Sequence, residues 1–213
     1  MGAYSRGGTN RVQVHAADHD FHCAGVLTPV GILLPKYDEL FLYGVTSKVT
    51  SDCLADILCQ WWESNKARFS CVSTLVLNLD NGPENHSRRT QFLSRLVDFV
   101  QATGMRIYLA YYPPYHSKYN PIERCWGRLE QHWNGSLLES VETVLRFAST
   151  MRWKNKHPCV QWVSGIYQTG VSLSQKAMAF LETTVERLPG LEKWFVDIRP
   201  SNFTAGSLGG FNL

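Results

Sequence analysis

Two short runs of mostly apolar residues lie in the first quarter of the chain, at residues 26–34 and 40–45. Both are rich in β-branched, leucine and aromatic side chains, and the stretch Pro35-Lys36-Tyr37-Asp38 separates them. Such runs favour strands, and a short polar connection between two of them is typical of a β-hairpin. The pattern therefore predicts a hairpin over residues 26–45.

Helical and strand patterns alternate through the rest of the chain. Thr50, Ser51 and Asp52 are residues that commonly cap a helix, and apolar positions then recur at helical spacing as far as Glu63. The other predicted elements are a strand over 72–79, a helix over 87–102 closed by Gly104, a strand over 105–112, and helices over 121–133, 137–151 and 174–187. This order predicts an α/β fold with a sheet layered between helices.

Composition and charge narrow the class of protein only slightly. The hydrophobic share of 44% and the charged share of 18% are ordinary for a globular domain of 213 residues. A net charge of +3 excludes a histone-like protein that binds nucleic acid through bulk charge, but it permits a local basic groove.

Other sequence features indicate an intracellular protein. The six cysteines form no C-x-x-C pair, which favours free buried thiols over disulfides or zinc ligands. The first eight residues are polar and glycine-rich, unlike a signal peptide, and no apolar run approaches the roughly 20 residues of a membrane helix.

Asp80 is the first candidate functional residue. It ends the predicted strand 72–79, and ligands of open α/β sheets bind at the carboxyl ends of strands. The alternative is that Asp80 merely begins an Asp-Asn-Gly turn.

Glu123 is the second candidate. Asn120 is a suitable N-cap, Pro121 suits the first helical position, and Glu123 then lies in the first turn of the helix. The alternative is that Glu123 only completes a capping box with Asn120.

The two carboxylates together point to metal chemistry. One ends a strand and the other begins a helix after the next strand, so both are expected at one edge of the sheet. Hard oxygen ligands suit Mg²⁺ or Mn²⁺ and not zinc. Two such ions, about 3.5–4 Å apart, would activate a water or 3′-hydroxyl and stabilise the leaving oxygen of a phosphodiester.

The same residues carry a resemblance to a known family. Residues 79–85 (LDNGPEN) and 112–123 (YPPYHSKYNPIE) resemble the second and third catalytic blocks of DDE transposases, and the similarity to the Rhodopirellula-type transposases of bacterial insertion sequences extends from residue 4 to residue 198. The resemblance implies an RNase H-like (retroviral integrase-type) mixed sheet flanked by helices over residues 1–198. Residues 199–213, rich in glycine and serine, are expected to form a flexible tail.

The family's catalytic set is Asp, Asp and Glu, and Asp80 and Glu123 match its second and third members. The first member lies on an opening strand before the segment that matches residues 4–8, so we expect that strand and its aspartate to be missing from this chain. A miscalled or truncated start, gene decay, and substitution by Asp18 or Asp20 remain open as explanations. The usual upstream helix-turn-helix region is also expected to be absent.

Aromatic and basic residues near Glu123 are candidates for DNA binding. Tyr115, His116 and Lys118 lie in the loop before the helix, and stacking and basic groups together suit unpaired bases and phosphates. Arg124 and Arg128 lie one turn apart on the helix and are expected to share a face. A tyrosine-packed loop and solvated charges are the alternatives.

The sequence thus predicts a transposase catalytic domain with two Mg²⁺ or Mn²⁺ ions that cleaves and joins DNA at transposon ends. Its partners are expected to be transposon ends, target DNA and further copies of the chain assembled on DNA, in the bacterial cytoplasm at the nucleoid, without a membrane. Little or no transposition activity is expected without the first aspartate. The alternatives are an RNase H-like nuclease that never joins strands, and an inactive form that binds DNA or full-length protomers and inhibits them.

Overall fold

The computed structural model describes residues 25–113, 119–136 and 138–200. The elements in chain order are β1 (Thr28–Leu34), β2 (Glu39–Val45), α1 (Ser51–Asn65), the 3-10 helix η1 (Lys66–Phe69), β3 (Thr74–Leu79), α2 (Thr90–Thr103), β4 (Arg106–Tyr111), α3 (Pro121–Trp133), α4 (Val141–Thr150), β5 (Cys159–Val163), α5 (Gln175–Thr184), β6 (Val185–Arg187) and β7 (Phe195–Ile198). Helices and strands are interspersed along the chain, in agreement with the α/β prediction.

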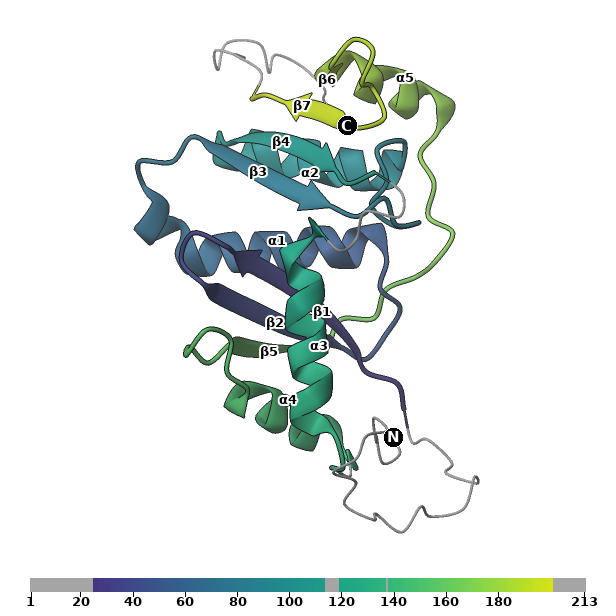
Figure 1. Ribbon diagram of the computed structural model, residues 1–213. Helices are drawn as coiled ribbons and strands as arrows, with labels where there is room; N and C mark the ends of the chain where they lie inside the picture. Colours follow the sequence, from purple (N-terminus) through teal and green to yellow (C-terminus); the bar gives the residue numbers. More distant parts are fainter. Residues whose placement is uncertain (1–24, 114–118, 137, 201–213) are drawn as a thin grey trace.

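The strands form two separate mixed sheets (Figure 1). In the first, β1 and β2 make the predicted antiparallel hairpin, and β5 pairs parallel to β2. In the second, β3 and β4 are parallel, and β7 joins β4 to β6 through antiparallel pairing. Along the chain, β1 and β2 belong to the first sheet, β3 and β4 to the second, β5 to the first again, and β6 and β7 to the second.

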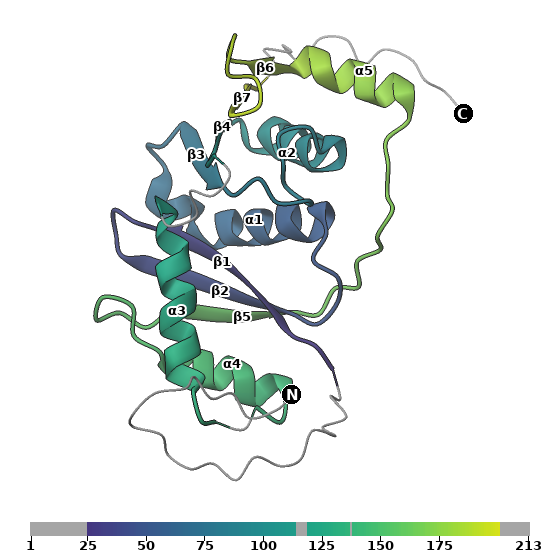
Figure 2. The ribbon, with the colours of Figure 1, turned by 45° about the vertical axis from the view of Figure 1, so that its right-hand side comes forward.

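Helices cover both faces of the first sheet. Alternate residues of β2 face opposite sides, because successive side chains of a strand point in opposite directions. Tyr43 and Val45 join the larger apolar core, which contains residues of α1 and α2, whereas Leu40 and Leu42 join a smaller core with α3 and α4. Figure 2 shows α3 and α1 on either side of the β1–β2 ribbon.

The larger core connects the two sheets. Ile57 of α1 and Leu96 of α2 pack in it together with Ile107 and Leu109 of β4, and all four are at most 2% exposed. The other face of the second sheet is more open, because Val76 of β3 is 58% exposed. Val76 belongs to the same strand that ends at Leu79, directly before Asp80.

Local capping explains why most helices begin and end where the sequence predicts. The Thr50 side chain accepts a hydrogen bond from the backbone N–H of Cys53, and the Asn120 side chain accepts one from Ile122 at the start of α3. Gly104 closes α2 with φ of 70°, a left-handed conformation that favours glycine.

Three sequence predictions are wrong in part. The helix predicted over 137–151 begins at Val141, because the Ser140 side chain caps it by accepting from Thr143 N–H. The helix predicted to reach residue 187 ends at Thr184, and β6 follows because its backbone pairs with β7. Of the cysteines, Cys71 and Cys159 are exposed and not buried, while Cys53 and Cys125 are buried free thiols.

None of the helices in the described ranges is long and apolar enough to cross a membrane. The predicted tail lies almost entirely outside the described residues, as do Asp18 and Asp20.

Candidate active site

Asp80 lies directly after the C-terminal end of β3, which is an edge strand of the second sheet. Its carboxylate is exposed, and its Oδ1 accepts a hydrogen bond of 2.9 Å from Asn85 Nδ2. Its carbonyl oxygen accepts one of 2.8 Å from Gly82 N–H, which closes a tight turn. A Cβ at Gly82 would lie 3.2 Å from Asn85 Oδ1 and 3.4 Å from Asp80 Oδ1, so the turn leaves little room for a larger residue. Turn and carboxylate thus form one compact unit.

Two contacts from distant elements hold the loop after Asp80 in place. The Tyr111 hydroxyl at the end of β4 donates a hydrogen bond of 2.8 Å to the Asn85 carbonyl. The Ser51 hydroxyl at the start of α1 donates one of 2.8 Å to the Glu84 carbonyl. Burial raises the pKa of Tyr111 well above its usual range, so the phenol stays protonated and remains a donor at neutral pH.

Asn85 has an acceptor that is buried without a partner among the described residues. Its Nδ2 is committed to Asp80, and its Oδ1 finds no hydrogen-bond donor. A buried amide oxygen of this kind costs free energy unless a donor or a cation satisfies it. This oxygen belongs to the same side-chain amide whose nitrogen donates to Asp80.

Glu123 lies in the first turn of α3, as predicted, and its side chain is exposed. The Asn120 side chain caps the helix by accepting a hydrogen bond from Ile122 N–H, and among the described residues the Glu123 carboxylate accepts none from Asn120 N–H. Within the part of the chain that the structure describes, this carboxylate has no ion pair either. The capping-box alternative for Glu123 therefore finds no support.

Asp80 and Glu123 line the same cleft, which we call the carboxylate cleft. Its volume is about 430 Å³, and Glu84, Asn85 and Asn120 also line it. Much of the rest of its wall is apolar and comes from β1, β3, α1 and α3, with Val30, Leu77, Leu79, Leu54, Ile57, Ile122 and Trp126 among the lining residues. The cleft thus presents oxygen atoms at one end of an otherwise apolar surface.

The donor atoms of the carboxylate cleft fit a hard divalent cation in kind. Two carboxylates and the orphaned amide oxygen of Asn85 are oxygen ligands of the type that Mg²⁺ and Mn²⁺ prefer. Over residues 25–113, 119–136 and 138–200, no group of three or more His, Cys, Asp or Glu side chains is close enough to hold a metal. The described residues alone therefore do not form a complete metal site.

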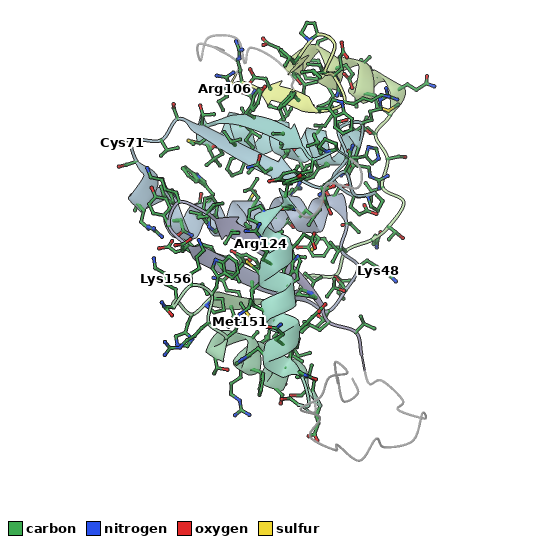
Figure 3. All side chains as sticks on the ribbon, in the orientation of Figure 1. Lys48, Cys71, Arg106, Arg124, Met151 and Lys156 are labelled. Carbon is green, nitrogen blue, oxygen red and sulfur yellow. The ribbon has the colours of Figure 1, made fainter. Side chains whose placement is uncertain are left out.

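The predicted DNA-binding residues are only partly described. Arg124 and Arg128 are exposed on α3, and Arg128 donates a hydrogen bond of 3.2 Å to Gln131 within its own helix. Figure 3 shows Arg124 on the same helix that carries Glu123. Tyr115, His116 and Lys118 lie outside the described residues.

Several other basic residues are already paired with carboxylates. Arg89 pairs with Glu84, Arg95 with Asp52 and Asp56, Lys154 with Asp38, and Lys156 with Glu39. These pairs fix local structure and reduce the charge available to a phosphate backbone.

The supporting role of Tyr111 and Ser51 was not predicted from the sequence. Tyr111 reads as one apolar residue of a strand and Ser51 as a capping residue, and both contacts reach across more than twenty residues of sequence. Asn85, in contrast, stands out in the LDNGPEN segment by its closeness to Asp80.

Comparison with known protein families identifies the family of this chain. The model of a protein family described as the Rhodopirellula transposase DDE domain matches residues 1–200. No curated protein and no solved structure matches the chain.

Proposed function

Because this chain belongs to the Rhodopirellula transposase DDE domain family, we propose that it carries out metal-dependent cleavage of DNA strands and their transfer at transposon ends. The observation that supports the proposal best is that Asp80 and Glu123, far apart in sequence, line one cleft.

Asp80 and Glu123 would hold the divalent ions, Mg²⁺ or Mn²⁺, of which two are expected in the active complex. When bound, such ions activate a water or a 3′-hydroxyl and stabilise the leaving oxygen of the phosphodiester. Asn85 would orient Asp80 through its hydrogen bond of 2.9 Å, and the apolar wall of the cleft would limit the access of bulk water. Arg124 and Arg128 would contact the phosphate backbone without reading sequence, because guanidinium groups suit phosphate oxygens.

The fold that we propose is an RNase H-like domain over residues 1–198. The hairpin β1–β2, the parallel pair β3–β4 and the helices on both faces of the first sheet are compatible with that arrangement. The two-sheet arrangement departs from the single mixed sheet that the resemblance implies, and residues 1–24 lie outside the described ranges. We also propose assembly of several copies on DNA ends.

The first experiment measures cleavage and joining of a labelled transposon-end DNA in Mg²⁺ and Mn²⁺. The chain and a version extended at its N-terminus by a strand that carries an aspartate are both assayed, and metal-dependent cleavage with joined products in either supports the proposal. In the active protein, Asp80→Asn and Glu123→Gln should each lower the cleavage rate by about 10³-fold or more, because each removes a ligand charge.

A control and a second readout accompany this test. Glu130→Gln lies on the same helix outside the cleft and should leave the rate within about twofold of the parent, as an exposed charge usually does. Mn²⁺ binding measured by calorimetry should weaken in Asp80→Asn and Glu123→Gln. Full activity of both variants would contradict the assignment of these residues.

The non-enzymatic alternative has one observation in its favour, since no three His, Cys, Asp or Glu side chains among the described residues lie close enough together to hold a metal ion. A chain that binds DNA or active protomers without cleaving would act as an inhibitor. DNA binding without metal-dependent cleavage, even in the extended protein, would support it. Cleavage without joined products would instead support a nuclease.

A further inference from the structure

Arg187 of β6 reaches the loop that follows Asp80, residues 81–89, which we call the Asp80 loop. Its Nη1 donates a hydrogen bond of 2.9 Å to the carbonyl oxygen of Ser87, a residue that is 4% exposed and lies 100 positions earlier in the chain. β6 is the strand of the second sheet that is farthest from β3 in the strand order (Figure 1). A side chain from the C-terminal part of the described chain thus binds the loop that begins after the proposed metal ligand.

The guanidinium group of Arg187 has further partners that fix its direction. Its Nε and Nη2 donate hydrogen bonds of 3.2 and 3.0 Å to the two carboxylate oxygens of Glu182, and Nη1 also donates one of 3.4 Å to the Glu192 carbonyl. The N–H donors of arginine lie in one plane, so a carboxylate that binds two of them also orients the others. Pairing with Glu182 therefore directs Nη1 toward Ser87.

The backbone that carries Arg187 is packed into the fold. Arg187 pairs with Val196 of β7, and β7 pairs with β4. Val185 at the start of β6 is 7% exposed, Leu181 of α5 is 4% exposed, and both belong to the larger apolar core. Arg187 therefore links the Asp80 loop to a part of the sheet that is itself held by strand pairing and by apolar contacts.

The Arg187 contact adds to the two contacts of the Asp80 loop described above. Side chains of α1, β4 and β6 donate to the carbonyls of Glu84, Asn85 and Ser87 respectively. The side chain of Asn85 in turn donates to the Asp80 carboxylate. Because each contact ties the loop to a different element, the three together fix where Asn85 lies relative to Asp80.

Arg187 also acts on Tyr111, the β4 residue that binds the same loop. Burial raises the pKa of the Tyr111 phenol, and the positive charge of Arg187 opposes that rise. The guanidinium group is therefore close enough to the phenol for its charge to be felt there. Two of the three donors that hold the Asp80 loop thus lie near each other.

We propose that Arg187 is a positioning residue for the Asp80 carboxylate and acts through the Ser87 carbonyl and the Asp80 loop. The inference rests on the proposed role of Asp80 in metal binding. Of the three contacts, that of Arg187 is the one closest to the start of α2, so its loss would free the end of the loop that follows Asn85. Asn85 would then hold Asp80 less often in the orientation that binds a cation.

Hydrogen exchange without metal and calorimetric titration with Mn²⁺, both on the full chain, test the proposal. Arg187→Met keeps an unbranched side chain and removes its donors. The backbone amides of Gly82, Asn85 and Arg89, which donate within the loop region, are expected to exchange faster. Mn²⁺ affinity should fall by about tenfold, the lower end of the effect of outer-shell residues. Loss of a positive charge would by itself favour a cation, so a weaker affinity reports position and not charge.

Two further variants separate the contact with the loop from the ion pair. Glu182→Gln removes the charge of the ion pair but keeps an oxygen acceptor for Arg187, so loop exchange and Mn²⁺ affinity should stay within about twofold of the parent. Arg187→Lys keeps a positive charge opposite Glu182 but not the planar fork of donors that also reaches Ser87, so it should resemble Arg187→Met. Arg187→Lys also serves if Arg187→Met does not fold, which circular dichroism checks.

Several results would overturn the positioning role of Arg187. These are unchanged exchange of the loop amides in both Arg187 variants, equal effects of Glu182→Gln and the Arg187 variants, and faster loop exchange with an unchanged Mn²⁺ affinity. Absence of Mn²⁺ binding in the parent would overturn the proposed metal site, and the role of Arg187 with it. Binding in the parent that the Arg187 variants leave unchanged would overturn the role of Arg187 alone, so the two failures are distinguishable.

Discussion

The hydrogen bond between Asn85 and Asp80 gives the proposed site its most specific residue-scale feature. The side-chain nitrogen of Asn85 donates to the Asp80 carboxylate, its backbone carbonyl accepts from the Tyr111 hydroxyl, and its side-chain oxygen is buried without a partner among the described residues. All three groups of one residue therefore have a defined position next to Asp80. Outer-shell residues of this kind orient metal ligands and contribute strongly to affinity.

We expect Asn85→Ala to weaken Mn²⁺ binding by about 10–100-fold, because Asp80 loses its hydrogen bond and the site loses an oxygen atom. Calorimetric titration of the full chain with Mn²⁺ measures this directly. Asn81→Ala is the control, since Asn81 is exposed, neighbours Asp80 and does not line the carboxylate cleft. Equal affinities for Asn85→Ala and the parent would show that Asn85 has no part in the site.

At the residue scale, the sequence is informative where the signal is local. The turn after β3 and the Asn120–Pro121 helix start predict the positions of Asp80 and Glu123, because both depend on a few neighbouring residues. The bonds from Tyr111 and Ser51 to the loop arise only when α1, β3 and β4 come together. No local pattern encodes them.

At the scale of elements, the presence of a strand to pair with decides whether a segment of ambiguous sequence forms a helix or a strand. The helical pattern of α5 continues past Thr184, yet residues 185–187 form a strand because β7 offers them a backbone partner. Neither β5 nor β7 was predicted, since each is short and is fixed by a strand distant in sequence. The longer elements, with their own caps and apolar stripes, were predicted within a few residues.

Charged side chains link β4 to β7. We call the group of Asp197, Arg106 and Arg199 the charged clamp. Asp197 of β7 is 7% exposed and accepts hydrogen bonds from Arg106 Nε at 2.7 Å and from Arg199 Nε at 2.9 Å. Burial tends to raise the pKa of Asp197, but the hydrogen bonds and charges of the two arginines outweigh it and hold the pKa below its usual value of 3.8.

This clamp predicts a pH dependence of stability. Since the pKa of Asp197 is lower in the folded than in the unfolded chain, its stabilising contribution is present above pH 3.8 and is lost as the pH falls through the folded value. Asp197→Asn should therefore lower the free energy of unfolding at pH 7, and the difference from the parent should shrink below pH 3.8. Urea unfolding followed by circular dichroism at several pH values measures both. A difference that grows on acidification would contradict the clamp.

At the scale of the whole molecule, one apolar core holds the two sheets together. Tyr43 and Val45 of the first sheet and Ile107 and Leu109 of the second belong to it, with Ile57 of α1 between them. The smaller core under α3 and α4 includes β2 residues but none from the second sheet. A cavity in the larger core should therefore destabilise both sheets, whereas a cavity in the smaller core should destabilise mainly the first sheet.

We expect Ile57→Ala to lower the free energy of unfolding by about 2–5 kcal/mol, because it leaves a cavity in the shared core. Hydrogen exchange should accelerate in both β2 and β4. Leu129→Ala, at a position that is 3% exposed in the smaller core, should cost a similar free energy but accelerate exchange mainly in the first sheet, α3 and α4. Acceleration confined to the first sheet in Ile57→Ala would show that the sheets do not share one core.

The repeated passage of the chain between the sheets has a consequence for its synthesis. The first sheet is complete only when β5 has left the ribosome, and the second only when β7 has, near the end of the described residues. At about 5–20 residues per second, the β1–β2 hairpin would wait for several seconds or more with its free edges exposed to other nascent chains. The protein is therefore expected to be most prone to aggregation during translation. Co-expression of a holdase chaperone should then raise the yield of folded protein more than refolding of the purified, full-length chain at a slower rate.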